Sequence, residues 1–197
     1  MSEEENILEI PGVDPNTNKI TPFQEITISE IPNGSILDIG GGGEGVIAQV
    51  GKKRVTAIDK RQSEIEEAIN KAPEAKWIVA DALDLPFKDG EFDNVTSFFS
   101  GMYMSNEDKR GVIKESYRVL SAGGELWIWD SKINTDKDMF LLVLTITLPG
   151  KEAFNTGYGS RIKNQDENIY KEYLAEAGFS IKEIDVNKYW FFIRAKK

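Results

Sequence analysis

A glycine run that follows a short apolar segment is the feature of this sequence with the clearest chemical meaning. In the stretch Ile36–Gly45 (ILDIGGGGEG), Gly40, Gly42 and Gly45 satisfy the spacing G-x-G-x-x-G, and Asp59 follows Gly40 by 19 residues. Between a strand and a helix, this spacing lets backbone amides approach a nucleotide, and the later carboxylate binds ribose hydroxyls. The alternative is a tight turn that binds nothing, but four consecutive glycines lose much backbone entropy without packing in return. We therefore expect a nucleotide-containing cofactor here.

Three aspartates are expected at the ends of successive strands. Asp38, Asp59 and Asp81 lie at or near the ends of short apolar runs, and open α/β sheets bind ligands at the carboxyl ends of their strands. Side chains that only accept hydrogen bonds suit ribose hydroxyls, an exocyclic amine and a positive charge. Asp38, two residues before the glycines, would repel the pyrophosphate of a dinucleotide but would tolerate a cation. The alternative is that all three aspartates are helix N-caps.

The elements that must position these residues alternate along the chain. Strands are predicted by short apolar runs rich in β-branched residues, and helices by apolar residues at helical spacing. The predicted strands are Ser35–Ile39, Val55–Asp59, Ala75–Ala80, Phe92–Ser100 and Glu125–Asp130; a helix begins near Gly43, and others span Ser63–Lys71, Lys109–Leu120 and Glu167–Ala177. Gly123-Gly124 is expected to end the third helix and Gly178 to cap the fourth. This alternation predicts an α/β fold, a doubly wound parallel sheet covered on both faces.

Two strand-like runs, Ser180–Val186 and Tyr189–Lys197, follow the last helix with no helix between them. A parallel return would need a crossover of about a dozen residues or more. These two strands are therefore expected to pair antiparallel and to end the sheet.

The stretch from Ile36 to Asp130, about half of the chain, resembles the core of class I S-adenosylmethionine-dependent methyltransferases that act on small molecules. The resemblance lies in the pattern LPF, FD, RVL and GG, present here as Leu85-Pro86-Phe87, Phe92-Asp93, Arg118-Val119-Leu120 and Gly123-Gly124. It implies a Rossmann-like seven-stranded sheet with strand order 3-2-1-4-5-7-6 and an antiparallel strand seven. It also implies S-adenosyl-L-methionine as the cofactor.

The resemblance implies a role for each matching position. Asp38 and the glycine loop would face the methionine moiety, Asp59 the ribose hydroxyls, Asp81 and Ala82 the adenine, and Ser97 to Phe99 the sulfonium. The family usually has a glycine where this chain has Glu44, so either the loop carries a one-residue shift, or Glu44 points away or contacts the methionine amino group. The expected cofactor-binding residues are Asp38, Gly40, Gly41, Gly42, Glu44, Asp59, Lys60, Asp81, Ala82, Ser97 and Phe98.

The segment between the fifth strand and the last helix is too long for an ordinary connection. Met139–Leu148, a turn, and Glu152–Tyr158 predict a β-hairpin insertion at about residues 134–163. This insertion is expected either to cover the acceptor or to serve as a dimerisation element or added core. Residues 1–33 are expected to form an N-terminal segment, loosely ordered to about Asn18, with Ile20–Ile31 as a second candidate lid. Residues 34–197 are expected to form a single methyltransferase domain.

Methyl transfer from a sulfonium is an in-line displacement, so positioning of the acceptor can supply most of the acceleration. A hydroxyl acceptor would need a general base, and Asp130, at the end of the fifth strand, is the expected candidate. Tyr103 and Tyr158, in predicted loop contexts, are expected to form a substrate wall. An amine, a thiol or an enolate-like carbon would need no base.

The composition excludes several classes of site. The 197 residues contain no His and no Cys, so disulfides, thiolate nucleophiles, zinc sites built on Cys or His, and Ser-His-Asp relays are impossible. A metal site is not expected. The net charge of −9 disfavours nucleic acid and anionic membranes as partners. A cytoplasmic monomer or homodimer is expected. The alternative functions are an NAD(P)-dependent oxidoreductase and a non-catalytic S-adenosylmethionine-binding protein.

Overall fold

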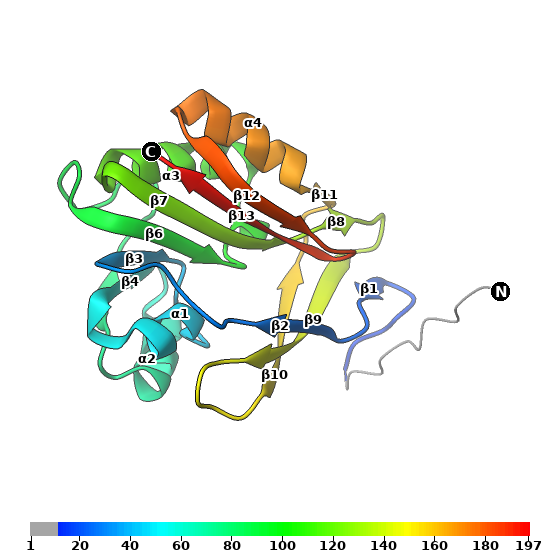
Figure 1. Cartoon of the computed structure of the whole chain (residues 1–197). Coiled ribbons are helices and arrows are strands. Elements are labelled where there is room, and N and C mark those ends of the chain that lie inside the picture. Colours follow the sequence, from blue (N-terminus) through cyan, green and yellow to red (C-terminus); the bar gives the residue numbers. More distant parts are fainter. Residues whose placement is uncertain (1–11) are drawn as a thin grey trace.

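The computed structural model describes residues 12–197, and its central element is a seven-stranded sheet (Figure 1). The expectation of loose order in residues 1–11 lies outside the described residues. The strand order is β12-β13-β7-β6-β3-β4-β5, which is the expected order 3-2-1-4-5-7-6 read from the other edge. The strands are β3 (Ile36–Ile39), β4 (Val55–Asp59), β5 (Lys76–Val79), β6 (Phe92–Phe98), β7 (Leu120–Ser131), β12 (Ser180–Val186) and β13 (Trp190–Lys196). As predicted, β13 is antiparallel to both of its neighbours.

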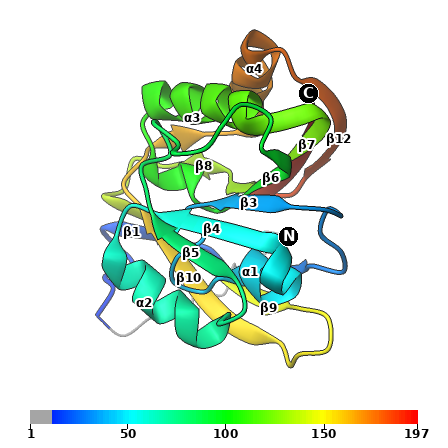
Figure 2. The ribbon, with the colours of Figure 1, turned by 90° about the vertical axis from the view of Figure 1, so that its left-hand side faces the viewer.

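Helices cover both faces of this sheet (Figure 2). Two helices, α3 (Asn106–Val119) and α4 (Glu167–Ala177), lie on one face, and α1 (Val46–Gly51) and α2 (Gln62–Lys71) lie on the other. Gly178 caps α4 in the left-handed region, as expected. The predicted end of α3 at the glycine pair is wrong, because Leu120 is already extended and starts β7, which contains both glycines.

A second sheet joins the N-terminal segment to the insertion. The strands β9 (Met139–Thr147) and β10 (Phe154–Ser160) form the predicted antiparallel hairpin. The short strands β1 (Asn18–Ile20) and β2 (Gln24–Thr27) both pair with β9 in parallel, which the sequence did not predict. A further small sheet pairs β8 (Ile133–Asn134) with β11 (Asn164–Gln165).

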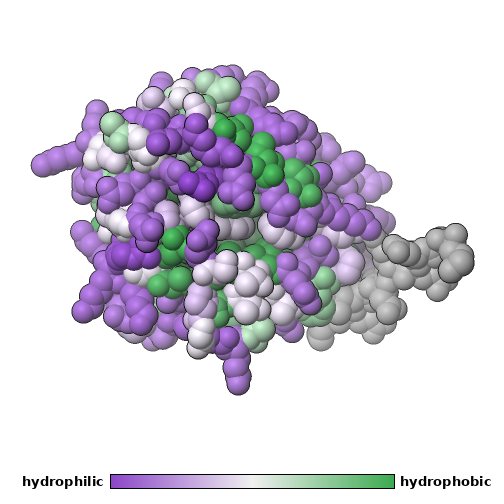
Figure 3. Space-filling model, in the orientation of Figure 1, coloured by the Kyte–Doolittle hydropathy of each residue, from purple (hydrophilic) through white to green (hydrophobic). Residues whose placement is uncertain are grey.

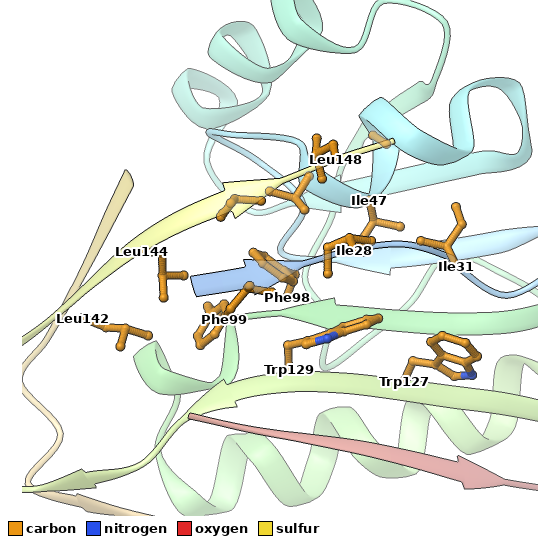
Figure 4. Close-up of a cluster of buried hydrophobic side chains, with 14 of the residues drawn as sticks. Ile28, Ile31, Ile47, Phe98, Phe99, Trp127, Trp129, Leu142, Leu144 and Leu148 are labelled. Atoms are coloured by element: carbon orange, nitrogen blue, oxygen red, sulfur yellow. The ribbon is translucent and has the colours of Figure 1, made fainter. Parts of the chain in front are cut away.

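Two buried clusters hold the layers together. One fills the space between the main sheet and α3 and α4 and includes Leu126, Ile128 and Phe191. The other includes Trp129 and Leu144 and joins the opposite face of the sheet to β9 and to the segment that follows β2 (Figure 4). Hydrophilic residues cover most of the face seen in Figure 3. Within residues 12–197, no helix has the length and apolar character needed to cross a bilayer.

Candidate active site

A cavity of about 640 Å³ opens at the carboxyl ends of the central strands. Residues that follow β3, β4, β5 and β6 line it, and β10 of the inserted hairpin contributes one wall. Of the eleven residues expected to bind the cofactor, the lining includes Asp38, Gly40, Gly41, Gly42, Glu44, Asp59, Lys60, Asp81, Ala82 and Phe98. The fold therefore brings the glycine run and the three aspartates to one site.

Asp38 is the most deeply buried charged group of this cavity. Its residue is 1% exposed, and its carboxylate accepts a hydrogen bond from the Thr96 hydroxyl at 2.7 Å. Burial raises the pKa of Asp38 to about 7; the Thr96 hydrogen bond opposes this shift, and the charge of Asp59 adds to it. A positively charged ligand group would offset the cost of burying the negative charge of Asp38 and its repulsion by Asp59. A phosphate would add to that repulsion.

The glycine loop fits tightly around Asp38. Gly40 has a φ of 66°, a left-handed conformation that favours glycine. A Cβ atom on Gly41 would collide with the Asp38 carboxylate, so this position admits no side chain. The Gly41 N–H donates to the Ile58 carbonyl at 3.0 Å, and this bond fixes the loop to the end of β4. The loop backbone is therefore packed directly against the Asp38 carboxylate.

Glu44 links the glycine loop to two other elements. Its carboxylate forms an ion pair with Lys71 of α2 at 3.0 Å and accepts a hydrogen bond from Thr156 of β10 at 3.4 Å. Helix α1 begins two residues after Glu44, with Gly45 as a left-handed N-cap. Glu44, at the position where the family usually has a glycine, thus places a carboxylate on the cavity wall.

None of the three aspartates caps a described helix. The N-cap of α1 is Gly45 and that of α2 is Arg61. Asp59 Oδ1 accepts the Arg61 N–H at 2.9 Å, and Asp81 Oδ1 accepts the Leu83 N–H at 2.9 Å. These local bonds orient the two carboxylates at the ends of β4 and β5 and leave acceptor capacity for a ligand.

Aromatic rings form the remaining wall. Phe98 meets Phe99 edge-on, and Phe99 stacks on Tyr158, with ring centroids 4.8 and 5.4 Å apart respectively. Phe99 has a φ of 51°, a strained conformation for a bulky residue that often occurs at functional sites. Tyr103 lines the same cavity and is 53% exposed. The structure therefore places both predicted wall tyrosines in the cavity.

Two predicted site residues lie elsewhere. Ser97 does not line the large cavity; its hydroxyl lies 2.7 Å from that of Ser100, behind the wall. Asp130 is also absent from the lining and is fully buried, where it accepts hydrogen bonds from Tyr170 Oη, the Ser131 N–H and Gln165 Nε2. The expectation that Asp130 acts as a base on the acceptor stays a prediction, and its burial outside the lining disfavours it.

Several lining residues were not predicted from the sequence, notably Arg61, Glu64, Thr156 and Gly157. Arg61 and Glu64 follow Asp59 closely, so their proximity to that carboxylate was an available signal. Thr156 precedes Tyr158 by two residues on β10 and so shares its face. Apart from Tyr158, no residue of the insertion was predicted from the sequence to face the cavity.

Comparison with known proteins agrees with this geometry. A family described as a methyltransferase domain matches residues 37–128. The chain is 32% identical over 106 residues to the demethylmenaquinone methyltransferase of Thermotoga maritima, covering 51% of this chain and 45% of that protein. It is 32% identical over 168 residues to the 27-O-demethylrifamycin SV methyltransferase of Amycolatopsis mediterranei, covering 78% and 57%. The chain thus spans less than two thirds of each of these relatives.

A solved structure shares the fold. It is an S-adenosylmethionine-dependent methyltransferase from Methanosarcina mazei, with a TM-score of 0.61 and 21% sequence identity, covering 83% of this chain and 92% of that one.

Proposed function

We propose that this chain, whose residues 37–128 match a methyltransferase domain, belongs to the class I S-adenosylmethionine-dependent methyltransferases and transfers a methyl group from S-adenosylmethionine to a small-molecule acceptor. The observation that carries the proposal is the convergence of Asp38, Asp59 and Asp81 with a tight glycine loop on one cavity. This set offers hydrogen-bond acceptors and negative charge at the strand ends where such folds bind ligands.

The residues present fit the cofactor. Asp38 would hold the positively charged methionine end, Asp59 the ribose hydroxyls, and Asp81 with the Ala82 amide the adenine. Lys60 and Phe98 also line this part of the cavity. The Gly41 backbone packs so closely on the Asp38 carboxylate that a Cβ there would clash with it, and this close approach of the glycine loop supports the assignment. When bound, S-adenosylmethionine supplies a methyl group on a sulfonium that an acceptor displaces in line.

The cavity favours a neutral or cationic acceptor. Seven of its lining residues carry carboxylates and two carry cations, so an anionic acceptor would be repelled. The rings of Phe99, Tyr103 and Tyr158 suit a planar or cationic molecule, because both pack well on aromatic faces. The two relatives described above are named for a quinone and a rifamycin acceptor. We infer an aromatic or amine-bearing small molecule.

The wall tyrosines are poor bases at neutral pH. Desolvation raises the pKa of Tyr103 to about 12 and also raises the pKa of Tyr158. Both phenols therefore stay protonated and can only orient an acceptor by packing or by donating a hydrogen bond. We propose that the chain orients an acceptor that is already nucleophilic, such as an amine, a thiol or an enolate-like carbon.

We also propose a cellular location, partners and an oligomeric state for this enzyme. The net charge of −9 supports a protein that works in the cytoplasm without binding nucleic acid or membranes, as a monomer or homodimer. An NAD(P)-dependent activity is disfavoured because the buried Asp38 would repel a pyrophosphate.

Calorimetric titration with S-adenosylmethionine, S-adenosylhomocysteine, NADH and NADPH tests the cofactor. We expect micromolar or tighter binding of the first two and no binding of the dinucleotides; the reverse pattern would overturn the proposal. A screen of aromatic and amine acceptors with a labelled methyl donor then tests catalysis. Cofactor binding without transfer to any acceptor would favour a non-catalytic binding protein.

A further inference from the structure

The two sequence neighbours of Tyr103 each have a backbone carbonyl that accepts a hydrogen bond from a buried side chain. The Met102 carbonyl accepts a hydrogen bond from the Ser160 hydroxyl at the end of β10. The Met104 carbonyl accepts one from Lys109 Nζ at 2.9 Å. Ser160 and Lys109 are 3% and 1% exposed. Exposed connecting turns are usually mobile, so these two bonds restrict the positions open to the half-exposed Tyr103 ring.

The location of Lys109 is unfavourable for a lysine in two respects. The residue is almost fully buried near the start of α3, and desolvation lowers the pKa of Lys109. The N-terminal end of a helix also carries a partial positive charge, which repels a cation. The charge of the buried Asp130 acts in the opposite direction and favours the ammonium. Departures of this kind from local preference are expected where function requires them.

The Lys109 amine acts from behind the wall of the large cavity. Lys109 does not line that cavity but borders a separate space of about 20 Å³, together with Gly101, Ser97 and Tyr170. Met104 lines both spaces and so separates the amine from the acceptor side. Lys109 therefore lies outside the lining of the large cavity, and we expect its effect on the reaction to pass through the turn.

We propose that Lys109 is a positioning residue: its buried ammonium holds the Met104 carbonyl so that the neighbouring Tyr103 ring keeps its place on the acceptor wall. Ser160 holds the other side of the same turn, which ties the position of the ring to the inserted hairpin. This inference rests on the proposed function, because it assigns Tyr103 to the acceptor end of that site. It adds a determinant of acceptor binding that lies outside the cavity.

The test uses the full chain labelled with 3-fluorotyrosine and observed by fluorine NMR. Among the six tyrosines, the Tyr103 signal is assigned by its loss in Tyr103→Phe. Lys109→Met removes the amine but keeps the apolar stem, and Lys114→Met is the matched control because Lys114 is exposed on the same helix. We expect the Tyr103 signal to broaden or to move toward that of the free amino acid in Lys109→Met only.

A change of the Tyr103 signal with the other five retained supports the proposal. An unchanged Tyr103 signal in folded Lys109→Met overturns it, even if the melting temperature falls. If Lys109→Met does not fold, Ser160→Ala decides instead: its Tyr103 signal should change, and an unchanged one contradicts the anchored turn. These outcomes do not depend on cofactor binding, so failure of the proposed function remains distinguishable.

With an acceptor in hand, a double-mutant cycle adds a kinetic readout. Lys109→Met should raise the acceptor KM by up to about a hundredfold, the upper scale of a small misplacement, and leave the Kd of S-adenosylhomocysteine within about twofold. In a Tyr103→Ala background the same substitution should have no further effect on the acceptor KM. An equal effect in both backgrounds would show that Lys109 does not act through Tyr103.

Discussion

The ring of Tyr158, on the inserted hairpin, stacks on the ring of Phe99, at the end of the central strand β6, with planes 14° apart. This contact joins the second sheet to the cofactor-binding sheet at the cavity wall. Phe99 is 1% exposed and holds a left-handed conformation. Removal of its ring would leave a cavity and expose the Tyr158 face.

Phe99→Ala is therefore expected to lower the free energy of unfolding by about 3–5 kcal/mol, the usual loss for a buried phenylalanine. Urea unfolding followed by circular dichroism measures this. Phe99→Gly separates the loss of the ring from the relief of backbone strain, because glycine adopts a positive φ without steric cost. Phe99→Gly should therefore be no less stable than Phe99→Ala; a clearly less stable glycine variant would contradict a strained backbone at this residue.

Asp59→Ala is expected to weaken S-adenosylhomocysteine binding by about 2–4 kcal/mol, because it would remove the charge-assisted hydrogen bonds that we propose Asp59 accepts from two ribose hydroxyls. Calorimetry measures the change, and circular dichroism checks the fold. The exposed Asp84, on the loop after β5, provides the control Asp84→Ala. A loss below about 0.5 kcal/mol at Asp59, of the order of an ordinary surface substitution, would mean that this carboxylate only orients the Arg61 turn.

Stability should depend on pH through Asp38. Its pKa in the folded protein is about 7, above the ordinary 3.8, so between these values the folded chain binds a proton that the unfolded chain has released. The free energy of unfolding should therefore fall as pH rises from about 4 to 7, by up to about 1.4 kcal/mol per unit, and level off above 7. Urea unfolding at several pH values measures this slope.

Asp38→Asn isolates the effect, because it removes this titration and leaves the other buried carboxylate, Asp130, in place. The variant should show a shallower fall of stability across the same pH range. Parallel curves for the wild type and the variant would contradict the raised pKa of Asp38.

Asp130→Asn is expected to affect stability and leave chemistry nearly intact. One carboxylate oxygen accepts hydrogen bonds from Ser131 and Gln165, and the other accepts one from Tyr170. An amide offers a single acceptor oxygen, so at least one buried donor loses its partner, at a cost of about 1–3 kcal/mol.

Methyl transfer by folded Asp130→Asn should stay within about tenfold of the wild type. A loss of about a hundredfold or more, the scale for a general base, with unchanged cofactor affinity would restore a catalytic role. Asp136→Asn, at an exposed position of the insertion, is the control.

In the inserted hairpin, ligand binding should slow amide hydrogen exchange in strand β10 only. Strand β9 is largely buried and pairs with β1, β2 and β10, so its amides should exchange slowly without ligand. Strand β10 carries Thr156 and Tyr158 to the cavity, and its exchange should slow when cofactor and acceptor are added. Protection that depends on protein concentration would instead indicate a dimer interface.

Most of the main sheet could be predicted because its strands are short, apolar and separated by helical periodicity. The antiparallel β13 followed from the short gap between Val186 and Trp190, which cannot hold a crossover. The pairing of β1 and β2 with β9 could not be predicted, because partners so distant in sequence leave no local pattern. The end of α3 was misjudged because Leu120 is apolar in either conformation.

The placement of side chains at strand ends was harder to predict than the strands themselves. On β7, Leu126 and Ile128 face α3 and α4, so alternation also directs Asp130 to that side, away from the cavity. Ser97 shares the face of Val95 for the same reason. A sequence places such residues at the ligand-binding edge, but the strand period decides whether they reach the ligand.

The pairing of the N-terminal strands with β9 constrains the order in which the protein can be made. The Val143 N–H donates to the buried hydroxyl of Thr21, 122 residues away. During synthesis from the ribosome, residues 18–27 must therefore wait unpaired until β9 emerges, after the first five strands of the main sheet. Contacts so distant in sequence slow folding, and until they form, each partner presents an open strand edge to other chains. Truncation of the first 27 residues would make that exposure permanent along β9.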